Sequence, residues 1–178
     1  VIQQMNMKKN IILWLSVLAF ISCSTSDSIS GALSLSKVSH SECVNRYLSR
    51  TRVDGDDPLS TKSMLRLTYN EADESITGEY INYLLCCDYT DAGMNVEQDA
   101  DGTLVLNPWN DSRGDVNCVC HLNIYFTIRH ATMQNYHLVL NRHTVTLINP
   151  DGSKRQELRT DYDGNISFKE QNVVTIDL

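Results

Sequence analysis

Hydrophobic and polar residues alternate in short runs along the chain from Ser63 onward, and residues that favour tight turns separate these runs. Because successive side chains of a strand point to opposite faces, a period of two predicts strands that are buried on one face. No stretch shows a sustained helical period. The predicted strands are 64–69, 78–89, 94–98, 103–107, 118–130, 136–141, 144–149, 156–160, 166–169 and 173–176.

Turn signals separate several of these strands. Asp101, Asp151 and Asp163 are each followed by glycine, and Asp-Gly pairs accept the positive φ of tight hairpin turns. Many short strands with turns between them must bury their inner faces against a second sheet. The sequence therefore predicts an all-β fold, a two-sheet antiparallel β-sandwich of immunoglobulin-like type, as a single domain over 41–178.

The same alternation predicts which face of its strand each cysteine occupies. The strand that begins at Cys118 alternates most clearly, and its apolar face carries Cys118 and Cys120. In the predicted strand 78–89, the odd-numbered positions from 81 to 89 are the more apolar set. Adjacent strand residues cannot share a face, so Cys87 is expected to face the core and Cys86 the opposite side.

These facings predict one disulfide from Cys87 to Cys118 or Cys120, with Cys43 taking the other of the two. Cys86 is then the expected reduced thiol. A bridge that closes a loop of about 30 residues typically stabilises a protein by about 2–4 kcal/mol. Spacing alone does not fix connectivity, and buried reduced thiols are the alternative.

The N-terminal segment has the order of parts found in an export signal. Lys8 and Lys9 precede an apolar run over 11–21, which is shorter than the roughly 20 residues that span a bilayer. The next sequence, Ala-Phe-Ile-Ser-Cys ending at Cys23, resembles a lipobox, a motif whose cysteine is acylated before the signal peptide is cleaved. The sequence therefore predicts a lipoprotein signal peptide over 1–22.

Lipidation of Cys23 sets the expected location. It places the protein in the outer membrane, held there by the lipid and facing the periplasm or the cell surface. The serine-rich stretch 23–40 is then expected to be a flexible tether. Translation is expected to start at Met5 or Met7. An ordinary cleaved signal peptide, in which Cys23 is incidental, is the alternative.

Charge and cysteine count narrow the possible partners. Removing 1–22 removes two lysines and no acid, so the formal net charge falls from −7 to −9. An acidic chain lacks the basic surface that nucleic acid requires, so no nucleic-acid partner is expected. Export permits disulfides. Acylation of Cys23 reduces the six cysteines to five, so an odd thiol is left over.

A resemblance accompanies the cysteine pattern. The Cys-Cys pair that ends at Cys87, the turn at Asp101, and Cys118 and Cys120 at the start of a strand occur in this order within 64–142. This order resembles small cysteine-bearing β-sandwich lipoproteins of Bacteroidota-type envelopes. The resemblance implies a sandwich fold and an envelope location. It implies no catalytic residue, because most of these relatives have no assigned activity.

The chain contains no familiar catalytic or metal-binding motif. It lacks a G-x-S-x-G elbow and an H-E-x-x-H motif. His121 follows Cys120 directly and must face away from it in a strand, so no metal or cofactor is predicted. A thiol hydrolase would need Cys86 beside a histidine such as His130 or His143.

Trp109 is the candidate binding residue. It lies in a polar stretch, 107–111, that is expected to be a loop after a strand, where an aromatic ring can stack on a sugar or anchor a partner. The alternative is a ring that caps the end of the core.

The predicted function is a non-enzymatic binding or structural module for a protein or glycan, with contact loops such as 112–117 or 54–59. The competing class is a small secreted effector, a hydrolase or a protease inhibitor.

Overall fold

The computed structural model describes residues 32–48, 61–116, 118–143, 147–148, 151–155 and 157–178. These residues contain twelve β-strands and no helix. The strands are β1 (Ser34–His40), β2 (Val44–Leu48), β3 (Met64–Asn70), β4 (Ser75–Cys86), β5 (Ala92–Gln98), β6 (Leu104–Asn110), β7 (Cys118–Arg129), β8 (Asn135–His143), β9 (Leu147–Ile148), β10 (Lys154–Arg155), β11 (Leu158–Ser167) and β12 (Val173–Asp177).

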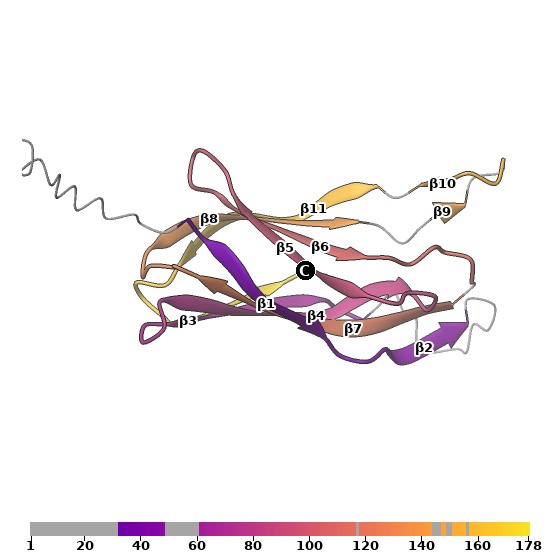
Figure 1. Cartoon of the computed structure of the whole chain (residues 1–178), viewed down its shortest axis with the longest axis horizontal. Helices are drawn as coiled ribbons and strands as arrows, with labels where there is room; N and C mark the ends of the chain where they lie inside the picture. Colours follow the sequence, from indigo (N-terminus) through magenta and orange to yellow (C-terminus); the bar gives the residue numbers. More distant parts are fainter. Residues whose placement is uncertain (1–31, 49–60, 117, 144–146, 149–150, 156) are drawn as a thin grey trace, which may run out of the picture. The chain divides into compact units, whose positions relative to one another are not determined.

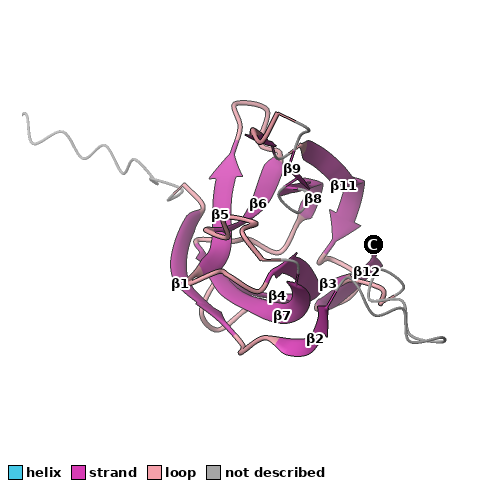
Figure 2. Cartoon of the chain, turned by 90° about the vertical axis from the view of Figure 1, so that its right-hand side faces the viewer, coloured by secondary structure: helices cyan, strands magenta, loops and turns pink. Residues whose placement is uncertain are grey.

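Two sheets lie face to face as the layers of a sandwich, seen from two directions in Figure 1 and Figure 2. The six-stranded sheet has the order β1-β7-β4-β3-β12, with β2 also paired to β7, and the four-stranded sheet has the order β11-β8-β6-β5. The pairing of β6 with β8 is parallel and the other pairings are antiparallel. The predicted two-sheet sandwich is therefore confirmed. Strands β6 and β8 can pair in parallel because the chain between them passes through β7 of the other sheet, so no hairpin joins them.

The core lies between the two sheets. Alternate residues of β3, β4 and β7 meet alternate residues of β6 and β8, as a sandwich requires. Fully buried residues of this core include Leu65, Leu67, Tyr80, Leu104, Leu106, Leu122, Ile124, Leu138 and Leu140. The structure buries the inward face that the sequence predicts for β7 from Cys120 onward, and it also buries His121 on the opposite face.

A β-bulge changes the inward face of β4 part-way along the strand. The register with β7 shifts between Tyr80 and Tyr83, and Asn82 between them has a φ of +59°. Tyr80 and Tyr83 are both fully buried, because the extra residue moves the inward face from even to odd positions. The inward facing expected of Ile81 is therefore wrong, whereas Cys87 packs against the core as expected.

The turn predicted at Asp163 is also wrong. Asp163 and Gly164 lie inside β11 and pair with β8, so the two strands predicted on either side of them form one strand. Gly164 also lies close to Tyr162, since a Cβ at this position would lie 2.8 Å from the tyrosine hydroxyl. By contrast, Gly102 and Gly152 adopt the positive φ expected of turns, 84° and 82°.

The tether predicted over 23–40 extends too far, and the domain begins before residue 41. Ser34–His40 is β1, which pairs with β7 at the edge of the six-stranded sheet. Leu33 and Leu35 pack against the core, and the serines between and beyond them are exposed. The serines within 34–40 therefore belong to an edge strand, whereas residues 23–31 of the predicted tether lie outside the described part of the chain.

Candidate functional site

Two disulfides lie at the end of the six-stranded sheet where β7 begins. Cys43, between β1 and β2, is bonded to Cys120 of β7, with their Cα atoms 5.8 Å apart. Cys87, directly after β4, is bonded to Cys118, the first residue of β7, at a Cα separation of 5.4 Å. The structure thus forms both predicted bridges and selects Cys118 as the partner of Cys87.

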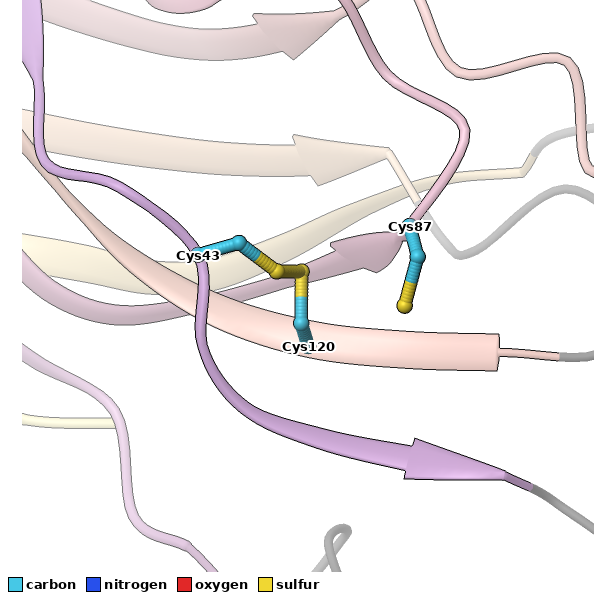
Figure 3. Close-up of side chains that lie close together, drawn as sticks. All are labelled: Cys43, Cys87 and Cys120. Carbon is cyan, nitrogen blue, oxygen red and sulfur yellow. A yellow bond between two sulfur atoms is a disulfide. The ribbon is translucent and has the colours of Figure 1, made fainter.

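The two disulfides are neighbours. The Sγ atoms of Cys43, Cys87 and Cys120 all lie within 4.8 Å of one another. Figure 3 shows the Cys87 side chain directed toward β7 beside the Cys43–Cys120 bridge. Cys120 is fully buried, and Cys43 and Cys87 are half-buried. His121 is not part of this cluster, because it occupies the opposite face of β7 from Cys120.

Cys86 takes part in neither of these disulfides and lies on the other face of β4 from Cys87. It is 4% exposed, and its partner residue in β7 is Val119. His130 follows the opposite end of β7, and His143 ends β8 in the other sheet. Neither histidine is a register neighbour of Cys86 in the six-stranded sheet.

Trp109 lies within β6, not in a loop. It pairs with Gly93 of β5, and its half-buried ring lies over that glycine, where a Cβ would be 2.9 Å from the indole. Pro108 does not end the strand, because β8 pairs with β6 only over Leu104–Leu106 and the rest of β6 has a ladder partner on one side. The loop expected at Trp109 is therefore part of strand β6, and the Trp109 side chain lies on the outer face of the four-stranded sheet.

The structure describes only part of the other predicted contact loops, 54–59 and 112–117. Residues 54–59 lie outside the described part of the chain, as does Cys23. The segment 112–116 is a surface loop in which Val116 is 43% exposed.

The outer face of the six-stranded sheet carries a hollow of about 340 Å³ across β1, β7, β4 and β3. Strand register places its side chains in two adjacent cross-strand rows. The first row is Ser39, Tyr125, Glu79 and Arg66, and the second is Lys37, Thr127, Thr77 and Thr68. Sequence alternation marks these residues as outward but does not show that they meet, because only strand order brings the four strands together.

The hollow combines hydroxyl groups, charge and an aromatic ring. Arg66 Nη1 lies 3.2 Å from Glu79 Oε2, so the guanidinium is held across two strands. Lys37 supplies a second cation on β1. Tyr125, a member of the first row, is 39% exposed. Cations outnumber the carboxylate here, although the whole chain carries a net charge of −7.

A second polar cluster lies between the sheets. Asp161 is the extra residue where the register of β11 with β8 shifts, and its Oδ2 lies 2.7 Å from Nε of Arg142. The Tyr80 hydroxyl donates to the same oxygen at 3.3 Å, and Asn110 Nδ2 donates to the Tyr83 hydroxyl at 2.9 Å. Burial raises the pKa of both tyrosines above the ordinary value, and for Tyr80 the Asp161 carboxylate raises it further. The cluster joins β4 of one sheet to β8 and β11 of the other.

Comparisons of the chain with protein-family models, with curated proteins and with solved structures find no match. Over the residues that the structure describes, no helix has the length and apolar character needed to cross a membrane. The geometry of the site is therefore the basis on which a function can be proposed.

Proposed function

We propose that this protein is a non-enzymatic binding module that takes a glycan in the hollow of the six-stranded sheet, and that a lipid on Cys23 anchors it in the outer membrane. The observation that carries the proposal is the pair of cross-strand rows. They place Ser39 and three threonines on the same face of the sheet as Tyr125, together with the charged groups of Lys37, Arg66 and Glu79.

The chemistry of these rows matches a sugar better than a protein surface. Serine and threonine hydroxyls both donate and accept hydrogen bonds, as sugar hydroxyls do. An exposed tyrosine ring offers a flat apolar surface on which the C–H face of a pyranose can stack. The volume of about 340 Å³ lies at the lower end of the roughly 300–1,000 Å³ typical of small-molecule sites. A protein partner instead needs a larger contact with an apolar centre.

The sheet also holds these side chains in place before a ligand arrives. Each lies on a strand that pairs with neighbouring strands, on both sides for β7, β4 and β3 and on one side for β1. Ladder hydrogen bonds therefore fix the backbone beneath the hollow. The Arg66–Glu79 pair further restricts the guanidinium. Binding therefore costs little ordering of the site, which favours affinity in a small pocket.

The envelope location rests on separate support. The apolar run that precedes Cys23 has the order of a lipoprotein signal peptide. Two disulfides in the described residues suit an oxidising compartment outside the cytosol. The cysteine pattern also resembles Bacteroidota-type envelope lipoproteins. Together these features favour a protein that faces the periplasm or the cell surface.

Glycan binding is tested with the delipidated protein on an oligosaccharide array, followed by calorimetric titration of the strongest ligand. Tyr125→Ala is expected to lower the affinity at least tenfold, about 1.4 kcal/mol, because the stacking surface is lost. Leu158→Ala, a 59% exposed residue of β11 in the other sheet, is the matched control and keeps the wild-type affinity. Trp109→Ala tests the alternative face. Failure of the array to show any ligand, or an unchanged affinity in Tyr125→Ala, contradicts the proposal.

The anchor is tested independently in cells fed a labelled fatty acid. Wild-type protein is expected to take up the label and to fractionate with the outer membrane. Cys23→Ala is expected to lose both properties. Label that persists in Cys23→Ala would show that this cysteine is not the acylation site.

A further inference from the structure

The sulfur atoms of the two disulfides lie closer together than two separate bridges require. Cys43, Cys87 and Cys120 come from three different segments of the chain, yet their Sγ atoms all lie within 4.8 Å (Figure 3). In a tetrahedral zinc–thiolate site, bonds of about 2.3 Å place the sulfurs about 3.8 Å apart. The Cys87 sulfur therefore lies at most about 1 Å beyond that spacing from the sulfurs of Cys43 and Cys120, whereas the bonded pair itself must move apart on reduction.

Cys118 is the fourth cysteine at this end of the sheet. It is bonded to Cys87, although its sulfur is not among the three that lie within 4.8 Å of one another. Four cysteines form a closed ligand set that is typical of structural zinc sites. The sequence does not show this set, because its members come from the β1–β2 connection, the end of β4 and the start of β7 instead of one C-x(2–4)-C turn.

Hydrogen bonds hold these segments together without the bridges. The Cys87 N–H donates to the Cys118 carbonyl at 3.0 Å. Near Cys43, the Ser41 N–H donates to the Asn123 carbonyl at 2.9 Å, and the Asn123 N–H donates to Ser41 Oγ at 2.9 Å. The backbone that carries the cysteines is therefore positioned by hydrogen bonds of the sheet as well as by the bridges.

We propose that Cys43, Cys87, Cys118 and Cys120 bind a soft divalent metal ion, zinc or cadmium, when both disulfides are reduced. A dithiol supplies two electrons and two protons to each bridge and leaves as its own disulfide. The metal ion then displaces the thiol protons and is held by thiolates. Cys120 is fully buried, and a buried thiolate is stable only beside a cation. The metal ion replaces the two bridges as the link between these three segments.

The test uses the full chain with Cys23→Ala, so that the N-terminal thiol does not contribute. The protein is reduced with a phosphine under anaerobic conditions and titrated with cadmium, and thiolate-to-metal charge-transfer absorption is recorded. One ion per chain is expected. Cys87→Ser and Cys120→Ser are each expected to weaken binding at least tenfold. Cys86→Ser is the matched control, because Cys86 lies on the opposite face of β4, and it keeps the wild-type affinity.

Three results overturn the proposal: no charge-transfer band on titration, an equal band in Cys120→Ser, or loss of the band in Cys86→Ser. Circular dichroism shows whether reduction unfolds the chain. If it does, cadmium is expected to restore the β-sheet signal in the Cys23→Ala protein and in its Cys86→Ser variant, but not in its Cys120→Ser variant. Absence of that recovery in the Cys23→Ala protein equally overturns the metal site, and none of these results bears on glycan binding.

Discussion

At the scale of single residues, Asp161 brings a carboxylate into the interior of the sandwich. Its side chain is 12% exposed and lies 2.7 Å from the Arg142 guanidinium, which is 31% exposed. Alternation along β11 does not predict this position, because the register shift that turns Asp161 inward is set by pairing with β8. A cation left without its partner at such a site destabilises the fold more than the pair itself stabilises it.

Asp161→Asn is therefore expected to lower the free energy of unfolding by about 2 kcal/mol, below the range for fully buried pairs because Arg142 reaches solvent. Urea unfolding measures the change. Asp163→Asn is the matched control: Asp163 pairs with His137 but is 63% exposed, so its loss is expected to stay below about 0.5 kcal/mol. Equal losses in the two variants would contradict a special role for Asp161.

Tyr80 makes the same cluster sensitive to alkaline pH. Burial, first, and the Asp161 carboxylate, second, raise the pKa of Tyr80 above the ordinary tyrosine value of 10.0. Above about pH 10 the unfolded chain therefore loses this proton while the folded chain keeps it, so stability falls as pH rises. Below that pH both states are protonated and stability does not depend on this group.

Tyr80→Phe is expected to unfold in urea with a shallower loss of stability between pH 9 and pH 11 than the wild type. Tyr125→Phe, on the exposed outer face, is expected to follow the wild-type curve. Parallel curves for Tyr80→Phe and the wild type would mean that this hydroxyl stays accessible to solvent in the folded protein.

At the scale of elements, β4 shows a limit to predicting inward and outward faces from the sequence pattern. The alternation predicts the faces of Tyr83, Leu85 and Cys87 correctly but misplaces Ile81, because it cannot reveal a bulge. The bulge depends on a distant partner: the Asn82 N–H donates to Asn123 Oδ1 of β7 at 3.1 Å. Boundaries near Pro108 and Gly164 fail for the same kind of reason, since neighbouring strands decide what those residues do.

Gly78 in β4 is a second element-level feature. Its partner residue in β7 is Phe126, and a Cβ at Gly78 would overlap the Phe126 ring. Gly78→Ala is therefore expected to destabilise the fold by about 3 kcal/mol, measured by urea unfolding. Adding Phe126→Leu is expected to recover part of this loss, because it removes the overlap. A loss in Gly78→Ala that Phe126→Leu does not relieve would point to backbone strain instead of a steric clash.

At the scale of the whole molecule, the sandwich and its bridges were accessible from sequence and the hollow was not. Cysteine facing needs only alternation within one strand, so Cys87 and its two candidate partners could be named. The hollow needs the order β1-β7-β4-β3, in which Lys37 lies beside Thr127 and Thr77 beside Thr68. Lys37 and Thr127 are far apart in the sequence, and the local pattern of a strand does not show which outward residues gather around a hollow.

The two disulfides differ in the loops that they close, and this difference makes a prediction about the whole chain. Cys43–Cys120 spans 77 residues and Cys87–Cys118 spans 31, and the shorter loop is nested in the longer one. Each bridge already shortens the chain that the other must close. On loop entropy alone, the longer bridge stabilises by about 4 kcal/mol and the shorter by about 3 kcal/mol in the presence of the other.

Removing each bridge as a pair avoids an unpaired sulfur. Cys43→Ala with Cys120→Ala is expected to cost about 1 kcal/mol more than Cys87→Ala with Cys118→Ala, measured by urea unfolding. The denaturant slope is also expected to rise more in the first variant, because its unfolded chain is released over the longer loop and exposes more surface. A larger cost for the shorter bridge, with an unchanged slope, would show that the bridges act by holding β4 and β7 in the folded state and not by limiting the unfolded one.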